Sequence, residues 1–133
     1  MKQILRNKDK GTPSERYKKS FKHAIDGIVY ATKYEHNMYI IIPCTILAVV
    51  AGFTFKISPV EWLFMILVIG LVIGTEMINT AIEAVVDLKT LEYNPLAKIA
   101  KDTASSATLI FSVVAFIGAL IMFVPKLLEI LNF

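Results

Sequence analysis

The sequence predicts an all-α integral membrane protein, with three transmembrane helices and an N-terminal amphipathic helix on the membrane surface. Hydrophobic residues make up 56% of the 133 residues, which is more than soluble domains usually contain. These residues are also concentrated in three blocks, each close to the roughly 20 residues that a helix needs to cross a bilayer. The length fits a single domain over residues 1–133.

The part of the chain before the first block is polar and basic, and it predicts a basic tail over residues 1–13 and a surface helix over residues 14–35. No short apolar core precedes the first block, so we expect no cleaved signal peptide. Thr12 and Glu15 have the spacing of a capping box. Five apolar residues then recur at helical spacing: Tyr17, Phe21, Ala24, Ile25 and Ile28. Basic residues on the other faces suit anionic headgroups, although packing against other helices would explain the same pattern.

The three apolar blocks predict transmembrane spans over residues 38–55, 60–82 and 105–124. Ser58 and Glu61 form a second capping box just before the middle span. Asn94, which is followed by proline, starts a helix whose first turns should stand in the cytoplasm before the third span begins. We expect this helix to end at Val124, because Pro125 follows it.

Lysine and arginine residues predict the orientation of the spans. Nine precede the first span, one lies between the first and second spans, and three lie between the second and third. Because cytoplasmic loops carry the excess of positive charge, the N-terminus is predicted in the cytoplasm and the C-terminus outside the cell.

The middle span carries a stripe of polar residues on one face of its helix. At 100° per residue, five side chains fall within about 100° of one another: Glu76, Asn79, Thr80, Glu83 and Asp87. Glu76 lies 16 residues after Val60, which places it about 24 Å along the helix, near the inner edge of the hydrocarbon core. A carboxylate at that depth needs a partner or a function, whereas Asp87 fits a solvated helix end equally well.

These residue types suit the transfer of a phosphoryl group. Carboxylates can hold a divalent metal, and one in a partly apolar place can act as a general base. Glu35, Lys101 and Asp102 are predicted on the same side of the membrane as the stripe, where their charges would assist transfer. The usual glycine-rich nucleotide motifs are absent, so a kinase would need an unusual membrane-embedded design. The other class to consider is a small proton-coupled transporter, in which Glu76 would load protons.

The polar stripe resembles the signature of the small bacterial integral-membrane lipid kinases. The resemblance is carried by E-x-x-N-T-A-I-E-x-x-V-D over residues 76–87 and by Ala100-Lys101-Asp102, and it covers nearly all of residues 14–124. This family comprises the prokaryotic diacylglycerol kinases and the undecaprenol kinases of Gram-positive bacteria. The resemblance implies a homotrimeric helix bundle in the bacterial cell membrane, with active sites shared between subunits, that uses ATP and Mg²⁺.

The resemblance also implies roles for individual residues. Glu76 would be the general base, oriented by Asn79, and Asp87 would organise the site. The metal ligands would be Glu35 and Glu83. The nucleotide contacts would be Arg16, His23, Glu35, Glu83, Glu92, Tyr93, Asn94, Lys101 and Asp102, and Ser105 would lie near the lipid substrate together with Glu76.

Two positions depart from the family pattern, and the substrate is less directly implied. Asn94 stands where relatives commonly carry His, and Tyr39 stands where many carry Arg.

The long basic N-terminal extension resembles that of the Gram-positive branch, and so do the sequence motifs EHNM at residues 35–38, EW at 61–62 and NTAIE at 79–83. This resemblance implies undecaprenol as the phosphate acceptor. Diacylglycerol is the alternative acceptor, because nothing in the spans identifies the lipid physically.

Overall fold

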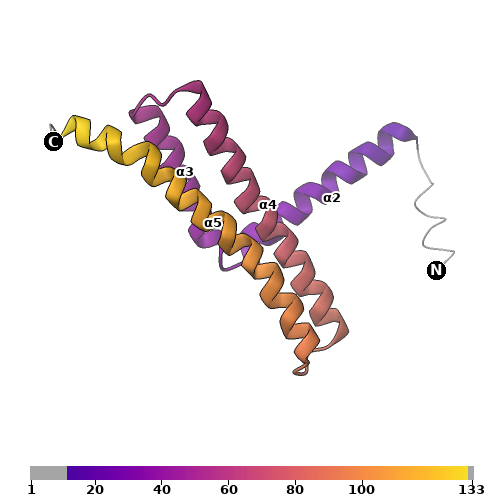
Figure 1. The fold of residues 1–133 in the computed structure, drawn as a ribbon. Helices are drawn as coiled ribbons and strands as arrows, with labels where there is room; N and C mark the ends of the chain where they lie inside the picture. The colour runs from indigo at the N-terminus through magenta and orange to yellow at the C-terminus, as the bar shows by residue number, and fades with distance from the viewer. Residues whose placement is uncertain (1–11, 132–133) are drawn as a thin grey trace. The chain divides into compact units, whose positions relative to one another are not determined.

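The structure is a computed structural model that describes residues 12–131, so most of the predicted basic tail, residues 1–11, lies outside the described residues. The described residues form four α-helices, as predicted, and contain no strand. Figure 1 shows these helices in chain order. The chain divides into two compact units, Met1–Tyr34 and Glu35–Phe133.

The first unit contains helix α2, Pro13–Tyr34. Its start confirms the predicted capping box: the Thr12 amide donates to Glu15 Oε2 at 2.8 Å, and the Glu15 amide donates to Thr12 Oγ1 at 3.3 Å. The apolar residues at helical spacing remain exposed, Tyr17 and Phe21 among them. The helix is therefore confirmed, and its place on a membrane surface stays a prediction.

The second unit contains helices α3, Met38–Thr54, α4, Pro59–Lys89, and α5, Pro95–Ile130. Helices α4 and α5 pack side by side and antiparallel, and α3 contacts α4 over a smaller area (Figure 1). The predicted start of α4 is confirmed, because Ser58 and Glu61 form a reciprocal capping box. Asn94 starts α5 as predicted, with its side-chain oxygen accepting from the amides of Leu96 and Ala97.

The predicted end of the last helix is wrong. Helix α5 continues through Pro125 and ends at Ile130. Proline removes one backbone donor and crowds the preceding turn, but neighbouring helices and local adjustments make it tolerable in membrane helices. Beyond the proline, Lys126 Nζ lies 3.0 Å from Glu61 Oε1, and this pair ties the last turns of α5 to the first turn of α4.

The inward face of α4 changes character along its length. Its buried residues recur every three or four positions: Met65, Val68, Val72, Glu76, Asn79 and Thr80. Opposite them on α5, the buried residues are Ala104, Thr108 and Met122. The α4–α5 interface is thus apolar toward Pro59 and polar toward Lys89, and the polar part contains the predicted site.

Two helices, α4 and α5, are long and apolar enough to cross a membrane by length and composition. Among the described residues, the number of crossings rises to three if α2 and α3 are taken as one broken span. Helix α3 alone has 17 residues, at the short end of what a crossing requires. A membrane-embedded helical protein is confirmed, and the third crossing over residues 38–55 stays a prediction.

Candidate active site

Glu76 is the most deeply buried polar residue of the second unit, with 0% of its surface exposed. Its Oε1 accepts a hydrogen bond from Asn37 Nδ2 at 2.9 Å. Its Oε2 is also buried and has no hydrogen-bond partner among residues 12–131. Buried carboxylate oxygens are rarely left without a partner unless they have a function, so the unpaired Oε2 marks Glu76 as a candidate reacting group.

Asn79 lies one turn further along α4, and it is 3% exposed. Its Nδ2 donates to Glu83 Oε1 at 3.2 Å, and its own Oδ1 has no partner within the described chain. The sequence led us to expect that Asn79 orients Glu76. In the structure the Asn79 amide is hydrogen-bonded to Glu83, and the donor to Glu76 comes from Asn37.

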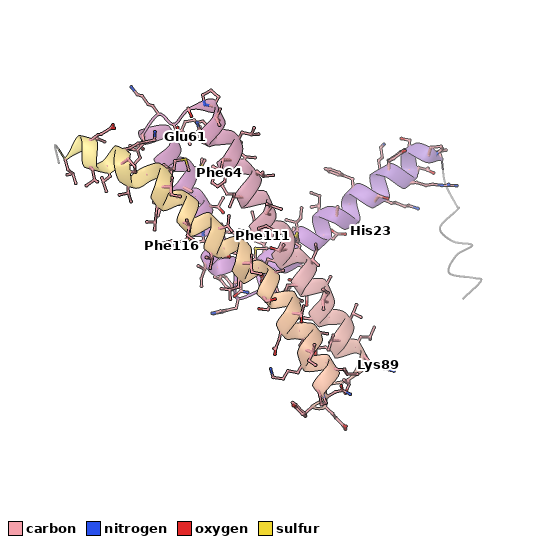
Figure 2. The ribbon with its side chains drawn as sticks, viewed as in Figure 1. His23, Glu61, Phe64, Lys89, Phe111 and Phe116 are labelled. Carbon is pink, nitrogen blue, oxygen red and sulfur yellow. The ribbon has the colours of Figure 1, made fainter. Side chains whose placement is uncertain are left out.

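The polar stripe ends in an ion pair between α4 and α5. Lys101 Nζ lies 2.6 Å from Asp87 Oδ1, and both side chains are partly exposed. The hydrogen bond to Asp87 raises the pKa of Lys101 above its ordinary value, and the charges of Asp87 and Glu83 act in the same direction. One turn earlier on α5, Lys98 pairs with Asp102. Charged groups of both signs thus gather at the Lys89 end of the α4–α5 pair. Figure 2 labels Lys89 at this end of α4 and Glu61 near the other end.

The remaining predicted residues of the second unit lie before α3, on α5, and in the turn between α4 and α5. Glu35 is half-buried and stands two positions before Asn37, while Ser105 is exposed on α5. The predicted nucleotide contacts Glu92 and Tyr93 are exposed in the turn between α4 and α5. Asn94 caps α5 with its side-chain oxygen, and this structural role accounts for its presence without any ligand.

Two predicted nucleotide contacts belong to the other unit. Arg16 and His23 lie on α2, where His23 Nδ1 is 4.0 Å from Asp26 Oδ2. Figure 2 labels His23 on this helix. Their participation in the site stays a prediction, because they are not part of the unit that contains Glu76.

Sequence reasoning missed two residues that the structure adds to the site. Asn37 was visible as an amide directly before the first apolar block, but it gave no sign that it would reach a residue 39 positions away. Thr108 is 6% exposed on α5, and its Oγ1 has no partner among the residues described. Because Asp87 pairs with Lys101 in this antiparallel pair, the register puts Thr108 at about the level of Thr80 along the helix axis.

The donor set fits a magnesium ion that is held partly by substrate. Within residues 12–131, no three His, Cys, Asp or Glu side chains lie close enough to hold a metal by themselves. Mg²⁺ usually takes one or two carboxylates together with phosphate oxygens and water. Glu83 is half-buried on the polar stripe, and Glu35 stands two positions before the residue that contacts Glu76, so a two-carboxylate site for a nucleotide-bound Mg²⁺ is compatible with the fold.

Comparison with known proteins connects this geometry to a family. Residues 22–123 match the family model for prokaryotic diacylglycerol kinase. The chain is 39% identical to undecaprenol kinase of Bacillus subtilis (strain 168) over 121 residues, which cover 91% of this chain and 98% of that protein. It is 33% identical to a diacylglycerol kinase of Synechocystis sp. over 84% of this chain and 65% of that protein. It is also 36% identical to a diacylglycerol kinase of Helicobacter pylori (strain J99) over 71% of this chain and 76% of that protein.

The matched region includes all of α4, most of α5 and every residue of the polar stripe. The match with the Bacillus subtilis protein extends over nearly the whole of both chains. The chain therefore belongs to the family of prokaryotic diacylglycerol kinases, on the branch that contains the Gram-positive undecaprenol kinases, and it is a membrane lipid kinase.

Proposed function

We propose that this lipid kinase transfers the γ-phosphoryl group of ATP to the hydroxyl of undecaprenol, and that Glu76 is the general base. In the step, Glu76 Oε2 accepts the hydroxyl proton while the lipid oxygen bonds to the γ-phosphorus. The bond from that phosphorus to the bridging oxygen breaks, and ADP leaves. The observation that carries the assignment of the base is the burial of Glu76 with an unpaired Oε2. Family membership replaces the transporter interpretation of the same carboxylate.

We assign the charged end of the α4–α5 pair to the nucleotide. Glu35 and Glu83 would hold Mg²⁺, which neutralises phosphate charge when bound. The residues that would contact the nucleotide are Arg16, His23, Glu35, Glu83, Glu92, Tyr93, Asn94, Lys101 and Asp102. Asp87 holds the Lys101 ammonium in place at 2.6 Å, so it organises this part of the site.

The choice of undecaprenol rests on similarity. The relative that matches over 98% of its own length is an undecaprenol kinase. Diacylglycerol is the second candidate, because the Synechocystis and Helicobacter relatives are diacylglycerol kinases. Apolar contacts discriminate only by about 1–3 kcal/mol per methylene-scale difference, so we expect a preference between these lipids and not strict exclusion.

The assembly and orientation follow the same proposal. We propose a homotrimer in the bacterial cell membrane, with Ser105 near the lipid, the N-terminus in the cytoplasm and the C-terminus outside. Large apolar side chains are exposed on α3, α4 and α5, which suits contact with lipid and with other subunits. The cluster of Lys89, Lys98 and Lys101 suits a cytoplasmic position for the Lys89 end of the pair.

The test is an assay of the purified protein with radiolabelled ATP and Mg²⁺ in mixed micelles that contain undecaprenol or diacylglycerol. The mole fraction of each lipid is varied, and the two values of kcat/KM are compared. We expect a ratio of about tenfold in favour of undecaprenol. A ratio that favours diacylglycerol would replace the substrate and leave the kinase unchanged.

A further inference from the structure

We propose that Asn37 is a positioning residue that fixes the carboxylate of Glu76, so that Oε2 alone is presented to the reacting hydroxyl. This inference rests on the proposed role of Glu76 as the general base. It assigns to the residue before α3 a part in the reaction that is separate from the role of Asn79.

The geometry distinguishes the two oxygens of the carboxylate. Asn37 Nδ2 donates to Oε1 at 2.9 Å, while Oε2 is buried and unpaired within the described part of the chain. The last torsion of a glutamate side chain is broad and nearly twofold, so an unrestrained carboxylate would exchange its oxygens. A directed donor on Oε1 sets the plane of the group and leaves one defined oxygen for proton transfer.

The alternative explanation for Asn37 is an ordinary helix cap. Asn37 occupies the position before α3, but its side chain makes no capping hydrogen bond to the described residues, and its φ and ψ of −63° and −29° are helical. A capping asparagine normally has extended backbone angles and accepts from an amide one turn on. The Asn37 side chain acts as a donor to α4, so the cap explanation does not describe its contact.

The two explanations predict opposite results for the same substitution. Aspartate and serine are as good as asparagine, or nearly so, at a helix N-cap, so a cap tolerates both. Positioning requires a donor toward Oε1. Asn37→Asp keeps the shape and removes the donor, and the two carboxylates would then either repel or share a proton. In both cases the Glu76 carboxylate is displaced from its position, and displacements of about 1 Å can lower rates about hundredfold.

The experiment measures kcat, the lipid KM, the ATP KM and the thermal unfolding midpoint for Asn37→Asp, Asn37→Ser and Asn37→Ala. We expect Asn37→Asp to lower kcat by about a hundredfold, and the other two by about tenfold, since one hydrogen bond to a charged group is lost. The ATP KM should stay near that of the parent, and the unfolding midpoint shows that each variant is folded under the assay conditions. Parental kcat in Asn37→Asp and Asn37→Ser would overturn the proposal in favour of a cap.

A double-mutant cycle provides the second measurement. Asn37→Ala is combined with Glu76→Asp, whose shorter side chain should not reach the Asn37 amide. We expect Asn37→Ala to lower kcat much less in this background than in the parent, because the two residues act as one unit. Equal losses in both backgrounds would overturn the proposal even if a single variant folds poorly. Activity of Glu76→Gln near the parental value would instead refute the base itself, so the two failures are distinguishable.

Discussion

The two ends of the α4–α5 pair differ in how completely their polar groups are satisfied. At the Pro59 end, Ser58 and Glu61 cap each other, and Glu61 also pairs with Lys126. At the Lys89 end, the buried Glu76, Asn79 and Thr108 each leave one side-chain atom without a partner among the residues described. Native proteins pair nearly all buried polar groups, and violations concentrate at functional sites. Polar groups are thus satisfied at the Pro59 end and left open toward the Lys89 end, which agrees with the active site that we propose there.

Packing at the Pro59 end supports the same distinction. A Cβ added to Gly52 would lie 3.0 Å from the Trp62 ring, and one added to Gly118 would lie 2.6 Å from the Phe64 ring. Figure 2 labels Phe64 near the start of α4. Glycine at these two positions lets aromatic rings lie against the backbones of α3 and α5. Ile57, Met65 and Met122 form an apolar cluster, against which Trp62 packs.

The largest contrast between the ends is expected for two matched carboxylates. Glu76→Gln should lower kcat by about a thousandfold, because the amide keeps the shape but cannot accept the proton. Nucleotide binding should remain near parental, as measured by equilibrium titration. Glu61→Gln, at the other end, should leave kcat within about twofold of the parent, which serves as the control. Activity of Glu76→Gln within tenfold of the parent would remove the functional half of the comparison.

The next effect concerns Glu83, whose carboxylate accepts a hydrogen bond from Asn79. Glu83→Asp should raise the magnesium concentration required for half-maximal activity by about tenfold or more, because carboxylate reach sets the ligand distance. Activity is measured against magnesium at fixed ATP, and Glu129→Asp, exposed near the end of α5, is the control. An unchanged magnesium requirement and rate in Glu83→Asp would show that Glu83 is not a ligand.

A smaller effect, on stability alone, is expected at the Pro59 end. Gly52→Val should lower the free energy of unfolding by about 1–3 kcal/mol, since the new methyl groups overpack against Trp62 and Ile57. The kcat of the folded protein should be unchanged. Gly70→Val is the matched control, because a Cβ at Gly70 would meet no described atom within 4 Å apart from its own chain neighbours and helix backbone. A loss of kcat in Gly52→Val would mean that the two ends are coupled.

The smallest effect tests whether the Lys89 end tolerates unpaired groups at a cost in stability. Thr108→Val should raise the free energy of unfolding by about 1 kcal/mol, because a buried hydroxyl without a partner is replaced by a methyl group of the same shape. Thr80→Val is the comparison variant, because it removes a buried hydroxyl that does have a partner: the Thr80 hydroxyl donates to the Glu76 carbonyl at 3.0 Å. A loss of stability in Thr108→Val would indicate that its hydroxyl is bonded in the assembled protein.

Local features of the sequence predicted the local features of the structure. The capping residues Thr12, Ser58 and Asn94 predicted three helix starts, because a cap depends on neighbours within one turn. The angles of the polar stripe predicted that Glu76 and Asn79 share a face, and both are buried on it. Pro125 misled the prediction of the end of α5, because tolerance of proline depends on tertiary and membrane surroundings.

Contacts between distant parts of the chain could not be predicted in this way. Periodicity gives the direction of a side chain on its own helix but not its partner on another. The hydrogen bond from Asn37 to Glu76 joins residues 39 positions apart, and the pair of Asp87 and Lys101 depends on the register of α4 against α5. The roles of Glu35, Arg16 and His23 came from family resemblance, and they stay predictions.

The complete burial of Glu76 bears on how a kinase avoids wasting ATP. Water is itself a phosphoryl acceptor, and it is far more abundant than any membrane lipid. On the proposal that Glu76 is the base, its lack of exposed surface keeps cytoplasmic water away from the proton acceptor, because exclusion of solvent from a closed site prevents such side reactions. A lipid hydroxyl, in contrast, arrives from the membrane attached to an apolar chain. On the same proposal, the position of Glu76 at the apolar end of the stripe would favour phosphorylation over hydrolysis, because it controls which acceptor can approach the carboxylate.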